Sequence, residues 1–167
     1  PLQVSHPIPP FIRPDSLVLI LGSFPSARSR ETGFYYGHQK NRFWFLLSML
    51  LKTGTPDSIT QKQSFLTMHR IALWDVVQSC EVAGSSDSSI RDVKINPINA
   101  LLSGSNIRAV LLNGKVAGKL FLANVCLKPD LPAIVLPSTS AANASCSLEK
   151  LAEEWKVILP CLKENRP

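Results

Sequence analysis

The sequence predicts an α/β protein, a three-layer α/β/α sandwich with a central, mainly parallel sheet of four strands. Four short apolar runs are continuous rather than alternating in polarity, which is typical of strands covered on both faces. Helical patterns separate these runs, and strands that alternate with helices form parallel βαβ units. The predicted strands are Leu17–Leu21, Ile71–Val77, Ile107–Leu112 and Ala133–Leu136.

Five helices are predicted around this sheet from the spacing of their apolar residues. Asp57 or Ser58 suits the cap of the second helix, and Pro160 disturbs the end of the last one. The predicted helices are Asn41–Leu51, a segment from Pro56 to about His69, Pro97–Leu102, Lys115–Ala123, and a segment from Ser147 to about Leu159.

A chain of 167 residues fits one domain, so we expect residues 1–167 to share a single core. The hydrophobic fraction of 45% and the charged fraction of 18% are typical of an ordered globular protein. Residues 1–14 contain several prolines and are predicted to lie extended along the domain surface. They lack the pattern of a signal peptide, and no apolar run reaches the roughly 18 residues of a membrane span. We therefore expect a cytoplasmic monomer with no membrane partner.

The net charge and the cysteines indicate which binding partners, metals and cofactors to expect. A net charge of +6 and a pI of about 9.4 give a basic surface that attracts polyanions, and nucleic acid is as good an explanation as a plain basic surface. No two cysteines form a CxxC pair, and no histidine lies at a ligand-like spacing from them. We expect no metal, no cofactor, and four free, mostly buried thiols. These residues are Cys80, Cys126, Cys146 and Cys161, with His6, His38 and His69 as the histidines.

In a parallel α/β sheet, ligands bind outside the carboxyl ends of the strands, so the loops that follow the four predicted strands should hold the site. The first of these loops begins Gly22-Ser23-Phe24-Pro25. Glycine lets the backbone approach a ligand closely, and Pro25 fixes the turn. Phe24 is either part of the core or a stacking face for a base.

The segment Gly33–Trp44 is dense in aromatic and hydrogen-bonding residues directly before a predicted helix. Asn41 suits a helix N-cap, and we assign Phe43 and Trp44 to the core. Two tyrosines in this segment are also consistent with a turn whose rings are partly buried. The position of the whole cluster at the carboxyl end of the sheet favours a binding site, with Tyr36, His38 and Asn41 as candidates.

The loop after the last strand offers three hydroxyl groups in a row, on Ser138, Thr139 and Ser140. Small side chains and backbone N–H groups suit contact with a phosphate backbone, although a plain serine-rich turn explains them equally well. Three residues at strand ends either line the pocket or pack there: Trp74, Asp75 and Asn113. The serine-rich stretch Gly84–Ser89 either contacts phosphates or is mobile.

Together these segments resemble the uracil-DNA glycosylase superfamily, from Val18 to about Asn143, and within it the hypoxanthine-DNA (deoxyinosine) glycosylase branch. That branch carries a glycine-serine-x-proline-glycine motif, a tyrosine-rich segment ending in histidine-proline-x-asparagine-x-phenylalanine-tryptophan, and a leucine-proline-serine-threonine-serine motif. Here the three motifs stand at Gly22–Pro25, Tyr35–Trp44 and Leu136–Ser140, and the middle one is the most specific.

The resemblance implies a role for each matching residue. Relatives place a polar catalytic residue where Phe24 stands, so that role passes to Asn41, which would contact the leaving base and position a water. Phe24 would stack on the flipped base. The rest of the base pocket would comprise Gly22, Ser23, Pro25, Tyr36, His38 and Asn113. The second motif and the contacts to the DNA backbone would comprise Ser138, Thr139, Ser140 and Ala142.

Several positions depart from the pattern of the branch. Ser26 replaces a glycine, which would reshape the turn that faces the phosphates. Gln39 and Ala141 replace prolines. Ala142 stands where relatives carry a wedge residue, and such a small side chain predicts weak extrusion of the base.

The expected function is that of a monofunctional deoxyinosine glycosylase of base excision repair, acting on DNA at the nucleoid. No lysine is expected in the pocket as a Schiff-base nucleophile, since Lys40 should point away from Asn41. A uracil or thymine-mismatch glycosylase is one alternative, and a non-catalytic nucleic-acid-binding module on the same fold is another. An α/β hydrolase is disfavoured because the sequence has no Gly-x-Ser-x-Gly elbow.

Overall fold

The structure, a computed structural model, describes residues 2–82 and 91–163, and a four-stranded parallel sheet with the order β3-β2-β6-β7 lies at its centre. The four strands of the sequence prediction are all present, with ends that differ by one or two residues. They are β2 (Val18–Gly22), β3 (Ile71–Asp75), β6 (Ala109–Asn113) and β7 (Ala133–Leu136).

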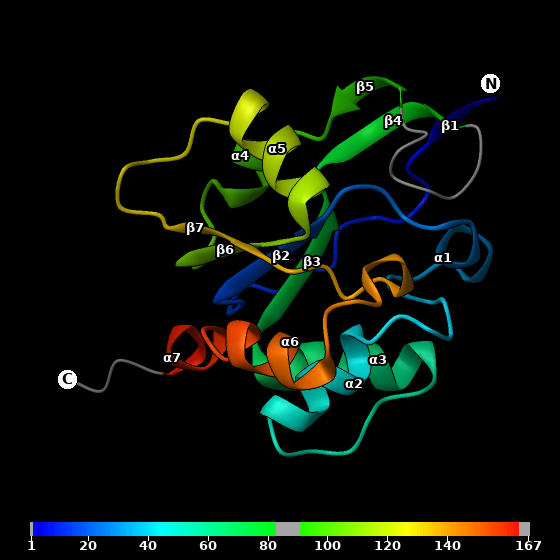
Figure 1. The fold of residues 1–167 in the computed structure, drawn as a ribbon. Helices are drawn as coiled ribbons and strands as arrows, with labels where there is room; N and C mark the ends of the chain where they lie inside the picture. The colour runs from blue at the N-terminus through cyan, green and yellow to red at the C-terminus, as the bar shows by residue number, and fades with distance from the viewer. Residues whose placement is uncertain (1, 83–90, 164–167) are drawn as a thin grey trace.

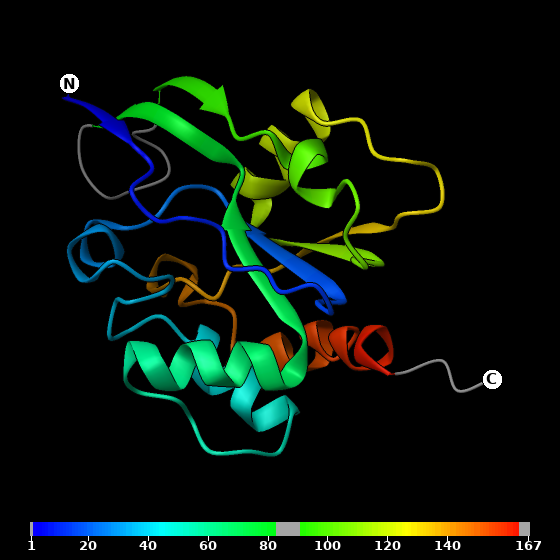
Figure 2. The ribbon, with the colours of Figure 1, turned by 180° about the vertical axis from the view of Figure 1, so that it is seen from behind.

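Helices cover both faces of this sheet, as the two opposite views in Figure 1 and Figure 2 show. One face carries α4 (Ile98–Leu102) and α5 (Lys115–Asn124). The other face carries α2 (Phe43–Leu50), α3 (Ile59–His69), α6 (Leu148–Trp155) and α7 (Ile158–Leu162). The predicted three-layer α/β/α sandwich is therefore confirmed.

A second, antiparallel sheet with the order β1-β4-β5 was not predicted. Its strands are β1 (Leu2–Ser5), β4 (Val77–Val82) and β5 (Arg91–Ile95). The single strand predicted over Ile71–Val77 is thus wrong at its end, because the chain passes from one sheet to the other at Val76. The buried Asn96 stabilises this transition, since its side-chain amide donates to the carbonyls of Asp75 (2.8 Å) and Val77 (3.2 Å).

Residues 1–14 were predicted to be extended on the surface, and residues 2–14, the part that the structure describes, are more closely integrated than the sequence suggested. Beyond β1, Phe11 forms an isolated antiparallel bridge with Leu73, and the two backbone N–H···O bonds between them are both 2.9 Å long. Ile8 is buried in the main core. This part of the chain therefore covers the outer edge of β3.

Two helix predictions need correction. The segment after Pro25 contains a short helix, α1 (Ala27–Thr32), and the hydroxyl of Ser26 caps it by accepting the backbone N–H of Ser29 (3.1 Å). The last helix is interrupted after Trp155 and begins again as α7. Pro160 lies in the first turn of α7, where the missing N–H costs no intrahelical hydrogen bond.

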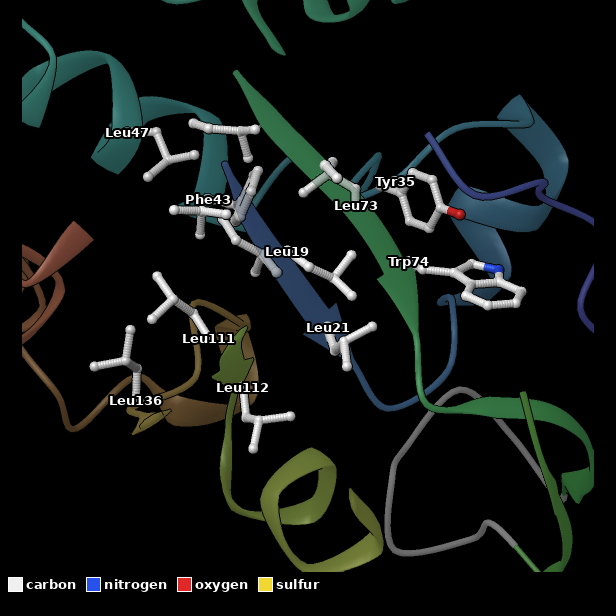
Figure 3. Packing of buried hydrophobic residues seen from close by; sticks show 14 of the residues in the cluster. Leu19, Leu21, Tyr35, Phe43, Leu47, Leu73, Trp74, Leu111, Leu112 and Leu136 are labelled. Atoms are coloured by element: carbon white, nitrogen blue, oxygen red, sulfur yellow. The ribbon is translucent and has the colours of Figure 1, made fainter. Parts of the chain in front are cut away.

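The main core lies between the sheet and the helices of both faces, and Figure 3 shows the part of it around β2. Val18, Leu19, Ile20 and Leu21 are fully buried, as a strand covered on both sides requires. The assignment of Phe43 and Trp44 to the core is confirmed, since both are buried. At roughly 25 cal/mol per Å² of buried apolar surface, this cluster supplies most of the driving force for folding.

Of the four cysteines, all are free thiols, but only Cys80 and Cys146 are buried, so the prediction of mostly buried thiols was only half correct. Burial raises the pKa of the Cys80 and Cys161 thiols, which keeps both protonated at neutral pH. Within residues 2–82 and 91–163, no helix is long and apolar enough to cross a bilayer. The stretch Gly84–Ser89 lies outside the described residues.

The start of α3 provides a test of the fold. Ser58 accepts the backbone N–H of Gln61 (3.1 Å), and the Gln61 side chain accepts the backbone N–H of Ser58, which together form a capping box. We predict that Ser58→Ala lowers the free energy of unfolding by about 1 kcal/mol, measured by urea denaturation. Ser64→Ala, the same substitution at an exposed interior position of α3, should raise it by a few tenths of a kcal/mol. Equal effects of the two variants would contradict the capping box.

Candidate active site

A cavity of about 770 Å³ opens at the carboxyl edge of the central sheet. The register brings the strand ends together there, because Gly22 pairs with Asp75 and Asn113 pairs with Leu136. Every site residue inferred from the sequence lines this cavity: Gly22, Ser23, Phe24, Pro25, Tyr36, His38, Asn41, Asn113, Ser138, Thr139, Ser140 and Ala142. The loops expected to carry the chemistry therefore converge on one space.

Asn41 is held by a chain of hydrogen bonds that joins three loops. The Asn113 amide nitrogen donates to the Thr139 hydroxyl (3.0 Å), and that hydroxyl donates to Asn41 Oδ1 (2.8 Å). The backbone N–H of Phe43 donates to the same Asn41 oxygen (3.0 Å). Because the Thr139 hydroxyl accepts from Asn113, its single proton must point to Asn41, and this fixes the orientation of the Asn41 amide.

The chemical consequence is that Asn41 can act on a ligand mainly as a donor. Its carbonyl oxygen has two lone pairs, and both are engaged, by Phe43 and by Thr139. The two N–H groups on Nδ2 are what the side chain can offer to the cavity. The N-cap of α2 is Arg42, so the N-cap interpretation of Asn41 is wrong by one residue, although the Asn41 side chain still accepts the first backbone N–H of the helix.

Asn113 and Thr139 support this arrangement from behind. The Thr139 backbone N–H donates to Asn113 Oδ1 (3.0 Å), which adds a second bond between the two residues. Thr139 is fully buried and Asn113 is only 8% exposed. Their polar groups bond mostly to each other and to Asn41, so both residues fix the orientation of the Asn41 side chain.

Arg42, which the sequence reasoning did not single out, ties the start of α2 to the last loop. Its guanidinium donates to the carbonyls of Cys146 (2.5 Å) and Asn143 (3.1 Å), and its backbone N–H donates to the carbonyl of Thr139 (3.0 Å). Three bonds from one residue thus hold the two segments that carry Asn41 and the serine-rich motif. No local sequence pattern indicates this role of Arg42, because its hydrogen-bond partners lie about a hundred residues further along the chain.

Tyr36, Phe43 and Trp155 form one cluster of aromatic rings beside the cavity, and Phe24 forms separate contacts. Tyr36 stacks on Phe43 with their centroids 4.0 Å apart, and Trp155 meets the edge of Phe43 and donates its indole N–H to the Pro137 carbonyl (2.9 Å). Tyr36 adopts a left-handed backbone conformation (φ 53°), which is uncommon for a bulky residue and indicates that the surrounding contacts impose it. These contacts place the Tyr36 ring at the cavity wall.

Phe24 is partly exposed and lines the cavity, as expected of a stacking ring. The Arg30 guanidinium lies 5.5 Å from its centroid, and the His6 ring approaches it edge-on at 5.8 Å. A cation above the ring face and a perpendicular ring both fix the plane of Phe24. The side chain is therefore oriented before any ligand arrives.

Asp75 lines the cavity, whereas Trp74 belongs to the core. Asp75 Oδ2 lies 2.7 Å from His6 Nε2, and both side chains are almost completely buried. Tyr35 lies nearby and donates its hydroxyl to the Pro9 carbonyl (2.8 Å). Burial first, and then the negative charge of Asp75, raise the pKa of Tyr35, so it remains a neutral donor. His6 entered the sequence reasoning only as a possible metal ligand.

The last loop turns into a short 3₁₀ segment over Ala141–Asn143, capped by Ser140, whose hydroxyl accepts the backbone N–H of Ala142 (3.2 Å). Ser138 accepts the N–H of Ser140 (3.1 Å), and Ala142 is exposed. Ser138, Ser140 and Ala142 thus remain at the mouth of the cavity, while Thr139 turns inward.

The structure modifies the expectation about lysines. Lys40 is exposed and is not part of the cavity lining, as expected, but Lys115 and Lys150 do line it. Both lysines are exposed, so their charges meet solvent at the mouth of the site. The described residues contain no group of three or more metal-ligating side chains.

This geometry defines a class of protein, an α/β/α sandwich with a polar and aromatic ligand cavity at the carboxyl edge of its sheet. The cavity volume lies within the range of small-ligand sites, roughly 300–1,000 Å³. The chain belongs to the uracil DNA glycosylase superfamily, whose family model matches residues 9–160. The protein is accordingly a DNA N-glycosylase, and this excludes the non-catalytic module as its main function.

Relatives of known sequence or structure agree with this assignment. The chain is 32% identical to a hypoxanthine DNA glycosylase of Methanosarcina acetivorans over 163 residues, covering 93% of this chain and 98% of the relative. It is 33% identical to a hypoxanthine DNA glycosylase of Methanosarcina barkeri, covering 88% and 92%. The fold matches the solution NMR structure of an M. acetivorans protein provisionally assigned as a uracil DNA glycosylase. The TM-score is 0.81 at 30% identity, covering 98% of this chain and all of that one.

The hydrogen-bond chain to Asn41 provides a test of the site. We predict that Thr139→Val, which keeps the shape but removes the hydroxyl, lowers base-excision activity at least tenfold because the Asn41 amide loses its orientation. It should also cost about 1–3 kcal/mol of stability, since the Asn113 amide is left unpaired. Thr139→Ser keeps the hydroxyl and should retain most of the activity. Single-turnover excision rates and thermal melting measure both effects, and full activity of Thr139→Val would show that this contact is dispensable.

Proposed function

We propose that this glycosylase removes hypoxanthine from deoxyinosine in DNA, as a monofunctional enzyme of base excision repair, with Asn41 as its catalytic residue. The observation that carries the proposal is the fixed Asn41 amide, whose Nδ2 donors are left for the cavity at the carboxyl edge of the sheet. The substrate rests on the relatives, which are hypoxanthine DNA glycosylases over nearly the whole chain.

The reaction begins with extrusion of the nucleotide, because the glycosidic bond inside a duplex is out of reach. Unstacking and unpairing cost a few kcal/mol, and least where pairing is already poor. The exposed Ala142 offers only a methyl group to fill the gap in the duplex. An enzyme with so small a wedge is best suited to bases that pair weakly, such as hypoxanthine opposite thymine.

Asn41 then stabilises the departing base. Cleavage of the C1′–N bond places negative charge on the base and positive charge on the sugar, and a fixed donor near the base lowers the barrier without reorganising in the transition state. The family resemblance also implies that Asn41 positions the attacking water. With both lone pairs of its Oδ1 engaged, that second task falls to other oxygen acceptors of the cavity.

Other residues would hold the nucleotide in place. Phe24 provides a ring of fixed plane against which the base can stack. Ser138 and Ser140, together with the charges of Lys115 and Lys150 at the cavity mouth, would contact the phosphates on either side of the extruded nucleotide. His38 is exposed at the same mouth and is a candidate for a further phosphate contact.

Uracil is the second candidate substrate. It is favoured by the superfamily to which the chain belongs, and uracil, like hypoxanthine, arises by deamination. We also propose that the enzyme acts as a monomer at the nucleoid, since residues of a single chain complete the cavity lining and its substrate is chromosomal DNA.

A pair of substitutions at one position tests the role of Asn41. Asn41→Asp can still accept from Phe43 and Thr139 but has no N–H donors, whereas Asn41→Ala loses all of these contacts. We predict that both variants lose roughly 10²-fold or more in the single-turnover rate on deoxyinosine duplexes. Asp should preserve the melting temperature better than Ala.

The same assay, repeated with deoxyuridine and with mispaired thymine, ranks the substrates after alkaline cleavage of the abasic sites. Hypoxanthine excision that is lost in both variants supports the proposal. Wild-type rates in Asn41→Asp would instead identify a carboxylate-compatible role such as proton abstraction. Uracil excision that survives Asn41→Ala would refute the assignment of Asn41.

The lysines at the cavity mouth make the monofunctional mechanism worth testing directly. Lys115 and Lys150 are exposed, so neither has the desolvated surroundings that activate a lysine as a nucleophile. We predict that borohydride traps no covalent complex between the enzyme and inosine-containing DNA. A trapped adduct that disappears in Lys115→Ala or Lys150→Ala would establish a lyase activity in its place.

A further inference from the structure

Arg30 lies in the last turn of α1 and does not line the cavity, yet its guanidinium lies over the ring of Phe24, which does. The Arg30 Cζ atom is 5.5 Å from the ring centroid, within the range of a cation–π interaction. The Arg30 side chain is only partly exposed. A positive charge is therefore held behind one ring of the cavity wall.

Hydrogen bonds at both ends of the Arg30 side chain keep it in this position. The backbone N–H of Arg30 donates to the Ser26 carbonyl (3.0 Å) within α1, and Nη1 donates to the Pro25 carbonyl (3.5 Å). Pro25 directly follows Phe24, so the side chain reaches from α1 back to the turn that carries the ring. The guanidinium and the ring are thus fixed relative to each other.

The second sheet supports the same ring from behind. Phe24 packs against Val77 and Cys80 of β4. Burial raises the pKa of the Cys80 thiol, and the positive charge of Arg30 partly offsets this rise, so Arg30 also faces β4. Phe24 lines the cavity, whereas Arg30, Val77 and Cys80 do not. The ring therefore separates the guanidinium from the cavity.

An aromatic stacking face is electrostatically unsuited to the product of this reaction. The face of an aromatic ring carries partial negative charge. It accepts a neutral base, but cleavage of the glycosidic bond leaves negative charge on the base. The ring alone would then be less favourable to the transition state than to the bound substrate, and this difference slows a reaction. A cation on the far side of the ring offsets the repulsion.

We propose that Arg30 is a positioning residue whose charge acts through Phe24, so that the stacking ring favours a base that departs as an anion. This inference rests on the proposed function, because it requires an anionic leaving base, and hypoxanthine and uracil both meet that requirement. A base in van der Waals contact with the ring would lie about 9 Å from the guanidinium. At an effective dielectric constant of about 20, a unit charge at that distance changes a rate on the order of tenfold.

The proposal distinguishes the rate of cleavage from the affinity for DNA. The base is neutral in the bound substrate, so loss of the Arg30 charge should slow cleavage and leave the affinity nearly unchanged. A role of Arg30 in binding phosphates would instead weaken the affinity. A role only in folding would lower the melting temperature, and a variant that restores the charge would not be needed for the rate.

The test compares Arg30→Met, which keeps most of the side-chain length without the charge, with Arg30→Lys, which keeps the charge. Single-turnover rates are measured at saturating enzyme on the duplex, deoxyinosine or deoxyuridine, that the wild type cleaves. We expect Arg30→Met to lose roughly tenfold in rate and Arg30→Lys to stay within about threefold of the wild type. Fluorescence anisotropy with the matching 2′-fluoro duplex, which resists cleavage, should show that Kd changes less than about threefold in both variants.

Arg28→Met is the matched control, because Arg28 lies in the same helix, is exposed, and pairs with Glu31 at 3.6 Å instead of with the ring. It removes the same charge from α1 and should leave the saturated rate unchanged. If Arg30→Met fails to fold, Arg30→Gln replaces it, since its amide can still donate to the Pro25 carbonyl while the charge is lost.

A double-mutant cycle with Phe24→Leu tests whether Arg30 acts through the ring. Without the ring, the guanidinium loses the face that holds it, so Arg30→Met should slow Phe24→Leu by no more than about threefold. A full tenfold loss in the Phe24→Leu background would show that Arg30 acts independently of Phe24 and would overturn the inference. Equal rate losses in Arg30→Met and Arg28→Met would overturn it as well.

The outcomes also separate this inference from the proposed function. If the wild type cleaves deoxyinosine and a folded Arg30→Met protein keeps the full rate, the role of Arg30 fails while the proposed function stands. If the wild type cleaves deoxyuridine but not deoxyinosine, the proposed substrate fails, and the variants decide the role of Arg30 on deoxyuridine. A wild type that cleaves neither base refutes both.

Discussion

The site depends on one chain of hydrogen bonds that runs from Asn113 through Thr139 to Asn41 and ends at the backbone of Phe43. It links the end of β6, the loop after β7 and the start of α2, which are distant in sequence. Each link is fixed by the one before it, because a hydroxyl that accepts one bond has a single proton left to give. The fold therefore sets not only where the Asn41 amide lies but which of its atoms faces the cavity.

Because this hydrogen-bond chain fixes the Asn41 amide, different side chains of the cavity can take separate roles. In the function we propose, Asn41 supplies donors and Phe24 supplies a stacking face whose plane is fixed by Arg30. Neither side chain needs to move to meet a planar heterocycle. Such preorganisation is what allows fixed dipoles to stabilise a developing charge at low cost.

The sequence predicted the central sheet well because the signal for a buried strand is local, and β2, β3, β6 and β7 are short runs of apolar residues. It also predicted that the candidate site residues gather at one edge of the sheet, where they line one cavity, since parallel strands bring their carboxyl ends together. It failed where the structure depends on distant partners. The passage from β3 to β4 depends on Asn96, and the contact between His6 and Asp75 spans 69 residues. No local pattern reports such contacts.

Contacts between segments that are distant in sequence also determine what individual site residues bond to. The sequence predicts Thr139 as a contact to the DNA backbone and Asn113 as part of the base pocket, and in the structure both side chains are buried and bonded to each other. Asn41 matches both a helix N-cap and a catalytic amide in the sequence, whereas in the structure Arg42 is the N-cap and the Asn41 oxygen accepts the N–H of Phe43 and the hydroxyl of Thr139.

The N-terminal segment has a consequence for the solution behaviour of the protein. A β-strand at the border of a sheet exposes unpaired N–H and C=O groups, which invite pairing with another copy and hence aggregation. Phe11 engages the backbone of Leu73 on the outer side of β3, and β1 pairs with β4 in the neighbouring sheet. The N-terminal residues therefore cover the outer edge of β3 and one edge of β4, and so limit pairing of these strands with another copy. A shortened or proteolytically trimmed chain would lose solubility together with the His6 contact, even though every residue of the central sheet is still present.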